Sequence, residues 1–165
     1  MPAEGEGRNA VYAAQQGWEV TAFDISESGR SKAMHLATEA GVQFTYHVGT
    51  LEEIPALRDD FDAIGLVFTH FPTEIRARLC GRLLTHLRPG GSMIFEAFAK
   101  EQLWYQQHHQ SGGPQLADML FSVDEVRSEL PGVAFSVLEE VEVRLDEGPF
   151  HQGLAKVVRG AGVRG

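Results

Sequence analysis

The chain has 165 residues, 43% of them apolar, which is enough for one globular domain with a substantial core. Its formal net charge of −9 offers no basic surface to a phosphate backbone, so we expect no nucleic acid partner. A single cysteine excludes an internal disulfide, and the lack of a long apolar run or a signal-peptide pattern predicts a cytoplasmic protein with no membrane partner.

Helical and strand-like patterns alternate from the N-terminus to residue 98. Ser26 is a suitable N-cap for the second helix, and Gly41 is a suitable stop for it. The predicted helices are residues 10–16, 26–40 and 73–87, and the predicted strands are residues 18–23, 42–47, 61–68 and 92–98. This alternation predicts right-handed crossovers and an α/β fold, with a mostly parallel sheet and helices on both of its faces.

The rest of the chain has a different pattern. Residues 100–115 are polar and aromatic with no clear period, and we expect a loop there. A short capped helix and two alternating strands are predicted at residues 122–130, 134–144 and 152–159. The two strands predict a C-terminal antiparallel hairpin. We expect one domain over residues 1–160 and a frayed tail at residues 161–165.

Two glycines and one aspartate indicate a nucleotide-like ligand. Gly5 and Gly7 directly precede the first helix, where glycines let the backbone approach a ligand and leave N–H groups exposed. Asp24 follows Gly7 by 17 residues, at the end of the next strand, where its carboxylate can accept hydrogen bonds from both ribose hydroxyls. With Ala10, the spacing also fits the dinucleotide fingerprint. A nicotinamide-dependent oxidoreductase is therefore an alternative, although the short chain and the hairpin argue against it.

The order of motifs resembles a known family. Residues 3–10 and 20–24 are similar to motifs I and II of class I S-adenosylmethionine-dependent methyltransferases, in particular the small bacterial tellurite-resistance-type branch. Residues 61–64, residues 88–91 and the hairpin also match that order, so the resemblance covers nearly the whole chain. It implies a Rossmann-like fold and methyl transfer from S-adenosylmethionine to a small-molecule acceptor.

The resemblance also implies a role for individual residues. Gly5 and Gly7 would contact the methionine part of the cofactor, Asp24 the ribose, and Ile25 the adenine. Further residues would come from the turns after the third and fourth strands of the family: Gly49, Thr50 and Leu51 at the adenine, and Phe68 and Thr69 at the floor of the site.

The chain departs from the family pattern in two places. The acidic residue and the glycine expected four and two positions before Gly5 are Met1 and Ala3, and Thr50 replaces the aspartate of the adenine turn. We expect the family's first strand to be missing, because only Pro2 and Ala3 remain of it. Unpaired backbone groups cost roughly 1–3 kcal/mol each, so we expect a homo-oligomer or a rearranged N-terminus. A catalytically inactive methyltransferase-like binding module is therefore an alternative function.

Methyl transfer requires alignment of donor and acceptor more than a catalytic side chain. If a base is used, His70 is the candidate, since it follows a central strand at the edge where ligands bind. A buried histidine bonded to backbone is an equally good interpretation. The candidate acceptor-pocket residues are Phe98, Trp104, Tyr105 and His151, each with a structural alternative. His108 and His109 are adjacent and point in different directions, so we expect no metal site.

Overall fold

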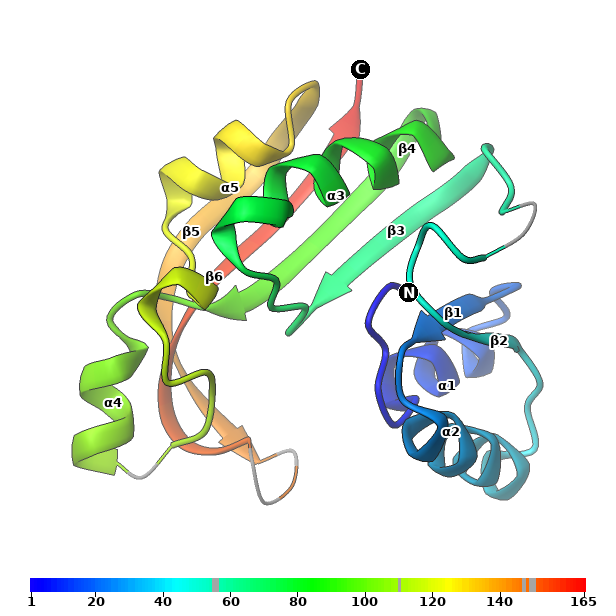
Figure 1. Cartoon of the computed structure of the whole chain (residues 1–165), viewed down its shortest axis with the longest axis horizontal. Coiled ribbons are helices and arrows are strands. Elements are labelled where there is room, and N and C mark those ends of the chain that lie inside the picture. The colour runs from blue at the N-terminus through cyan, green and yellow to red at the C-terminus, as the bar shows by residue number, and fades with distance from the viewer. Residues whose placement is uncertain (55–56, 110, 147, 149–150) are drawn as a thin grey trace. The chain divides into compact units, whose positions relative to one another are not determined.

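The computed structural model describes residues 1–54, 57–109, 111–146, 148 and 151–165, and its elements are labelled in Figure 1. Contacts divide the chain into two compact units. Unit 1 comprises Met1–Arg58 and Gly65–Thr69, and unit 2 comprises Asp59–Ile64 and His70–Gly165. The candidate cofactor-binding residues all fall in unit 1, whereas the candidate base and acceptor-pocket residues fall in unit 2.

Unit 1 contains two parallel strands and two helices. In chain order these are α1 (Arg8–Gln15), β1 (Thr21–Asp24), α2 (Glu27–Ala40) and β2 (Thr45–Val48). The strands pair in parallel from Thr21 opposite Thr45 to Asp24 opposite Val48. The predicted caps of α2 are confirmed: the Ser26 hydroxyl accepts a hydrogen bond from the Gly29 N–H, and Gly41 takes the left-handed conformation that ends the helix.

The first four residues of the chain pair with β1. Pro2 forms an isolated parallel bridge with Phe23, the Phe23 N–H donates to the Met1 carbonyl at 3.1 Å, and the Glu4 N–H donates to the Phe23 carbonyl at 3.1 Å. Thr69, which lies two residues after strand β3 (Phe61–Val67), donates through Oγ1 to the Pro2 carbonyl at 3.1 Å. Among the described residues before α1 there is a bridge and no strand, yet these four residues supply backbone partners to β1 from within the chain.

Unit 2 is built around a four-stranded sheet. Its strands, in spatial order, are β3 (Phe61–Val67), β4 (Leu87–Phe98), β6 (Gln152–Arg164) and β5 (Val133–Asp146). The arrows of β3 and β4 point the same way in Figure 1, whereas β6 is antiparallel to both β4 and β5. The last residues of β3 belong to unit 1.

Two helices pack on this sheet. α3 (Thr73–His86) packs against β4 and against α5 (Val123–Glu129), and α5 also packs against β5. The predicted cap of α5 is confirmed and has the form of a capping box, because the Ser122 hydroxyl accepts from the Glu125 N–H and the Glu125 carboxylate accepts from the Ser122 N–H. The predicted α/β fold with parallel strands, helices and a C-terminal antiparallel hairpin is confirmed.

Two local predictions are wrong. Residues 102–109 form a helix, α4 (Gln102–His109), where we expected a loop; the fully buried Gln102 side chain fixes it by donating to Ser111 Oγ and accepting from the Lys156 N–H. The expected frayed tail at residues 161–165 is strand as far as Arg164, paired with both β4 and β5. Its glycines permit close packing, since a Cβ on Gly162 would lie 2.7 Å from Cγ1 of Val133.

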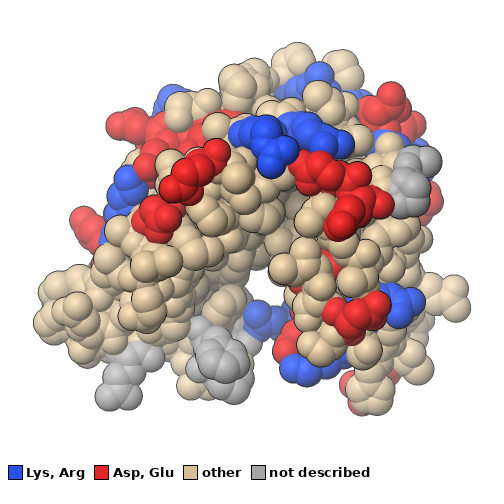
Figure 2. Space-filling model, viewed as in Figure 1, with Lys and Arg blue, Asp and Glu red and all other residues tan. Residues whose placement is uncertain are grey.

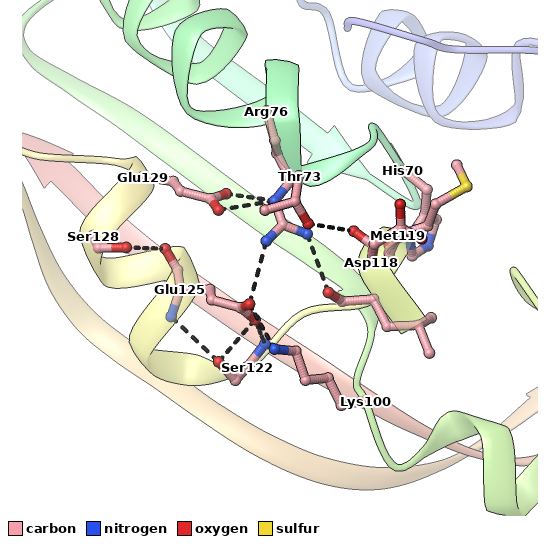
Figure 3. Close-up of polar contacts among 11 residues, drawn as sticks. His70, Thr73, Arg76, Lys100, Asp118, Met119, Ser122, Glu125, Ser128 and Glu129 are labelled. Carbon is pink, nitrogen blue, oxygen red and sulfur yellow. Dashed lines mark hydrogen bonds and ion pairs between the residues drawn. The ribbon is translucent and has the colours of Figure 1, made fainter. Parts of the chain in front are cut away.

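A fully buried arginine joins α3 to α5 (Figure 3). Arg76 Nε donates to both carboxylate oxygens of Glu129, at 2.9 and 2.7 Å, and Nη1 donates to the Leu120 carbonyl at 3.1 Å. Nη2 lies 3.7 Å from Glu125 Oε1, and the guanidinium lies 4.0 Å from the centroid of the Phe121 ring. A buried charge requires such partners because its loss of hydration costs several kcal/mol.

We expect Arg76→Met to lower the free energy of unfolding by about 3–5 kcal/mol, because the substitution leaves the buried Glu129 carboxylate without its cation. Urea unfolding followed by circular dichroism measures the change. Arg78→Met, on the exposed side of the same helix, is the matched control and should change it by less than about 1 kcal/mol. The double variant Arg76→Met/Glu129→Leu should recover most of the loss. A double variant as unstable as the single one would contradict this account.

Candidate functional site

The candidate cofactor-binding residues lie at two kinds of position in unit 1: the turn before α1, and the segments that follow the carboxyl ends of β1, β2 and β3. Ligands of open parallel sheets bind beyond the carboxyl ends of the strands. Backbone contacts bring three of these segments together. The Gly5 N–H donates to Asp24 Oδ2 at 3.1 Å, and the Gly49 N–H donates to the Asp24 carbonyl at 2.9 Å. Phe68 and Thr69 join them through the bond from Thr69 to Pro2.

The two glycines of the turn have different functions. Both are in the left-handed region, with φ of 60° at Gly5 and 88° at Gly7. A Cβ on Gly7 would lie 2.5 Å from the Cβ of Ala33, so glycine is required there for α1 to approach α2. A Cβ on Gly5 would meet nothing within 4 Å. The open space beside the turn is therefore at Gly5.

Asp24 organises the turn and retains capacity for a ligand. Its Oδ2 accepts the Gly5 N–H, and its Oδ1 accepts the Ser26 N–H at 2.9 Å. Each carboxylate oxygen has a second acceptor position, so two ribose hydroxyls can still be accommodated. Ile25, the next residue, is 75% exposed and leaves an apolar surface beside the carboxylate.

The turn after β2 contains a carboxylate that the sequence analysis missed. Thr50 donates to Glu53 Oε2 through its N–H at 2.8 Å and through its hydroxyl at 3.0 Å, and these bonds lower the pKa of Glu53. The spacing Thr50-x-x-Glu53 is the capping-box pattern, so the signal was present in the sequence. Leu51 is buried, in contrast, and belongs to the core.

Two non-glycine residues near the turn have a strained backbone. Phe68 has φ of 51° and Ala3 has φ of 49°, a left-handed conformation that costs of order 1–3 kcal/mol for a residue with a side chain. Thr69 is buried, and its hydrogen bond to Pro2 ties the end of β3 to the residue before Ala3. Strained positions of this kind gather at ligand sites.

Glu4 is a second residue that the sequence analysis missed. Its side chain is buried and accepts the Ala10 N–H at 2.7 Å, in the first turn of α1. Burial raises the pKa of Glu4, and the bonds from the α1 backbone act in the opposite direction. Since the N-cap Gly7 has no side chain, Glu4 satisfies this N–H in its place. The Ala10 N–H is therefore not available to a ligand, contrary to the simplest interpretation of the glycine turn.

His70, in unit 2, has both ring nitrogens engaged in hydrogen bonds to backbone groups. Nδ1 lies 2.7 Å from the Met119 carbonyl, which can only accept, so Nδ1 is the donor and Nε2 accepts the Phe98 N–H at 3.5 Å. Burial lowers the pKa of His70 to about 4. Thr73 Oγ1 and Arg76 Nη1 donate to the neighbouring carbonyls of Asp118 and Leu120. This geometry matches the alternative interpretation, a histidine bonded to backbone.

The candidate acceptor-pocket residues form two groups in unit 2. Phe98 is buried, and its ring centroid lies 5.6 Å from that of His70 and 5.6 Å from that of His151. Trp104 and Tyr105 pack edge to face on α4, where Trp104 is 52% exposed and the Tyr105 hydroxyl donates to Glu142 at 2.7 Å. His108 and His109 are adjacent on the same helix, and no group of three metal-ligating side chains occurs in the described part of the chain.

Three solved structures have a fold similar to that of this chain. TehB from Haemophilus influenzae gives a TM-score of 0.73 at 16% identity, over 98% of this chain and 55% of TehB. An S-adenosylmethionine-dependent methyltransferase from Methanosarcina mazei gives 0.73 at 16% identity, over 99% of this chain and 90% of that protein. Magnesium protoporphyrin IX methyltransferase from Synechocystis PCC 6803, which contains bound S-adenosylmethionine, gives 0.67 at 19% identity, over 99% and 68%. At these identities the likeness concerns the fold.

A family model described as a methyltransferase domain matches residues 3–91, which is more than half of the chain. No curated protein sequence is a detectable match. The matched region begins at the strained Ala3 and includes the glycine turn, Asp24 and the turn with Glu53. This match argues against the alternative of a nicotinamide-dependent oxidoreductase, because that class of enzyme shares only the glycine spacing with this chain. The chain belongs to the methyltransferase domain family.

Proposed function

We propose that this chain transfers a methyl group from S-adenosylmethionine to a small-molecule acceptor. The observation that carries the proposal is the position of Asp24, which accepts hydrogen bonds from Gly5, Ser26 and Gly49. It thereby joins the glycine turn and the start of α2 through its carboxylate, and the turn after β2 through its backbone carbonyl. The two similar structures that are described as S-adenosylmethionine-dependent or hold that molecule support this choice of cofactor.

The residues of unit 1 fit the chemical groups of S-adenosylmethionine. Asp24 offers a carboxylate for the ribose diol, and the exposed Ile25 offers an apolar surface for the adenine. Gly5 has open space beside it for the methionine part. When bound, the cofactor supplies a methyl group already activated on a sulfonium. The contribution of the chain is then to bind and orient, which favours a reaction without a general acid or base.

We assign no proton transfer to His70. A base must present an accepting nitrogen to the acceptor, and the Nε2 of His70 faces the Phe98 backbone instead. With a pKa lowered to about 4, the ring is also a weak base. We propose that His70 holds the segment at Met119 in place beside Phe98.

The acceptor, the location and the assembly stay predictions. Phe98, His151, Trp104 and Tyr105 are the proposed acceptor-pocket residues. Acidic side chains are interspersed with basic ones on the face shown in Figure 2, in keeping with the net charge of −9 and with a small molecule, not nucleic acid, as acceptor. No helix of the described residues has the length and apolarity needed to cross a bilayer. A cytoplasmic location and a homo-oligomer are the corresponding proposals.

We expect the chain to bind S-adenosylmethionine, and Asp24→Asn to weaken that binding at least tenfold. An amide has one acceptor oxygen where the carboxylate has two, so the ribose and the Gly5 turn would compete for it. Isothermal titration calorimetry measures both affinities. Asp62→Asn is the matched control, since the exposed Asp62 accepts from Arg88 in unit 2.

Two results would contradict this assignment. An Asp24→Asn variant that binds as tightly as the parent would exclude Asp24 from the site. A folded parent chain with no binding at millimolar cofactor would instead favour the inactive binding module, which the residues Met1 and Ala3 at the family's acidic and glycine positions also suggest.

We expect the stability of the protein to fall between about pH 6.5 and pH 4 because of His70. Its pKa is lowered to about 4 on folding, so the unfolded chain binds the proton at a higher pH than the folded one. The loss is about 2 kcal/mol from pH 7 to pH 5, with no contribution above pH 7. His70→Asn should remove this part of the pH dependence in urea unfolding. The exposed His35→Asn is the control, and identical profiles for parent and His70→Asn would exclude the effect.

A further inference from the structure

Gly5 is held at both of its peptide groups by side chains that are distant in the sequence. Its N–H donates to Asp24 at the end of β1. Its carbonyl accepts the hydroxyl of Tyr46, on β2, at 2.6 Å across 41 residues. Tyr46 is 8% exposed and packs in the core with Ala10 and Ala22. The turn is therefore fixed from two neighbouring strands.

Helix α2 also approaches this carbonyl closely. A Cβ on Gly29, the third residue of α2, would lie 2.9 Å from the Gly5 oxygen and 3.2 Å from its carbonyl carbon. A side chain of any size at Gly29 would displace the carbonyl from the Tyr46 hydroxyl. The absence of a side chain at Gly29 and the hydroxyl of Tyr46 thus define one position for the Gly5 oxygen.

Fixing this oxygen also fixes the next amide. In a trans peptide the C=O and the following N–H point in opposite directions, and the described chain has no cis bond. With the Gly5 oxygen directed at Tyr46, the Glu6 N–H is directed away from Tyr46. In the described residues the Glu6 N–H has no hydrogen-bond acceptor, and Glu6 is exposed. An unpaired amide beside the open space at Gly5 is a donor for a ligand oxygen.

We propose that Tyr46 is a positioning residue that orients the Gly5–Glu6 peptide so that the Glu6 N–H donates to an oxygen of the bound cofactor. The inference rests on the proposed function. Burial raises the pKa of Tyr46, and the charges of Asp24 and Glu4 raise it further, so the hydroxyl keeps its proton and donates at every physiological pH. The orientation of the turn is then independent of pH in the range where the enzyme would operate.

Tyr46→Phe tests this because it removes the hydroxyl and leaves the ring. We expect the dissociation constant for S-adenosylmethionine, measured by calorimetry, to rise about tenfold. Gly29→Ala should raise it similarly by displacing the same carbonyl while leaving Tyr46 intact, and it covers the case of a Tyr46 variant that does not fold. The matched controls are Tyr12→Phe, an exposed tyrosine of α1, and Gly81→Ala, whose added methyl meets nothing within 4 Å. Both should bind as the parent does.

A second measurement needs no cofactor. Amide hydrogen exchange of Gly5, followed by NMR in the unliganded protein, should be about tenfold faster in Tyr46→Phe, because the turn loses one of its two fixed peptide groups. Unchanged exchange would overturn the inference even if the parent chain bound no cofactor. A lower melting temperature with unchanged affinity would also overturn it, since that result describes a structural residue only. The two failures can be told apart. If the parent chain does not bind S-adenosylmethionine but Gly5 exchanges faster in Tyr46→Phe, the proposed function is refuted, whereas the orientation of the turn by Tyr46 is supported.

Discussion

The hydrogen bonds accepted by Asp24 determine how the loops of unit 1 are arranged. One residue connects the glycine turn, the start of α2 and the turn after β2, through its two carboxylate oxygens and its carbonyl. These segments have little regular structure of their own. Hydrogen bonds to a charged group contribute about 1.5–3 kcal/mol each, roughly twice the contribution of neutral ones. A ligand that approaches Asp24 therefore meets a carboxylate already fixed in orientation.

Unit 2 is stabilised in a different way. Here three side chains donate the hydrogen bonds that hold a loop in place. They are His70, just before α3, and Thr73 and Arg76 on α3, at intervals of three residues. Each donates to a different backbone carbonyl of the segment at residues 118–120. Arg76 also takes part in the buried pair with Glu129, so the same side chain connects α3 to that segment and to α5. In unit 1 a carboxylate accepts hydrogen bonds from backbone N–H groups, whereas in unit 2 side chains donate hydrogen bonds to backbone carbonyls.

The sequence predicted features that depend on neighbours along the chain. The caps of α2 at Ser26 and Gly41 and the alternation of the hairpin are local patterns, and the structure confirms them. The turn at Gly5 and the carboxylate of Asp24 were proposed as site residues because their spacing is characteristic of nucleotide sites. Tyr46 could not be found in this way, since its partner is 41 residues distant and an isolated tyrosine in a strand has no periodic signal. Glu4 was missed because the sequence alone does not distinguish a buried acidic side chain in a glycine turn from a solvent-exposed one.

Wrong predictions in unit 2 have the same physical origin. The tail of β6 looked frayed because glycines usually indicate flexibility, but Gly160 and Gly162 leave room for the side chains of Phe135 and Val133 from the adjacent strand. α4 looked like a loop because its helical signal is weak, and the tertiary contacts of Gln102 compensate for that. In both cases packing against a distant segment outweighs local preference.

The anchoring of residues 118–120 by their carbonyls has an evolutionary consequence. Every residue type has a carbonyl, so Asp118 and Met119 can be replaced without loss of their hydrogen bonds, whereas Leu120 is also constrained by its fully buried side chain. The donors have no such freedom, because each requires a particular side chain at a particular position of α3 or just before it. Substitutions in descendants of this chain are therefore tolerated more readily at Asp118 and Met119 than at the three donor residues.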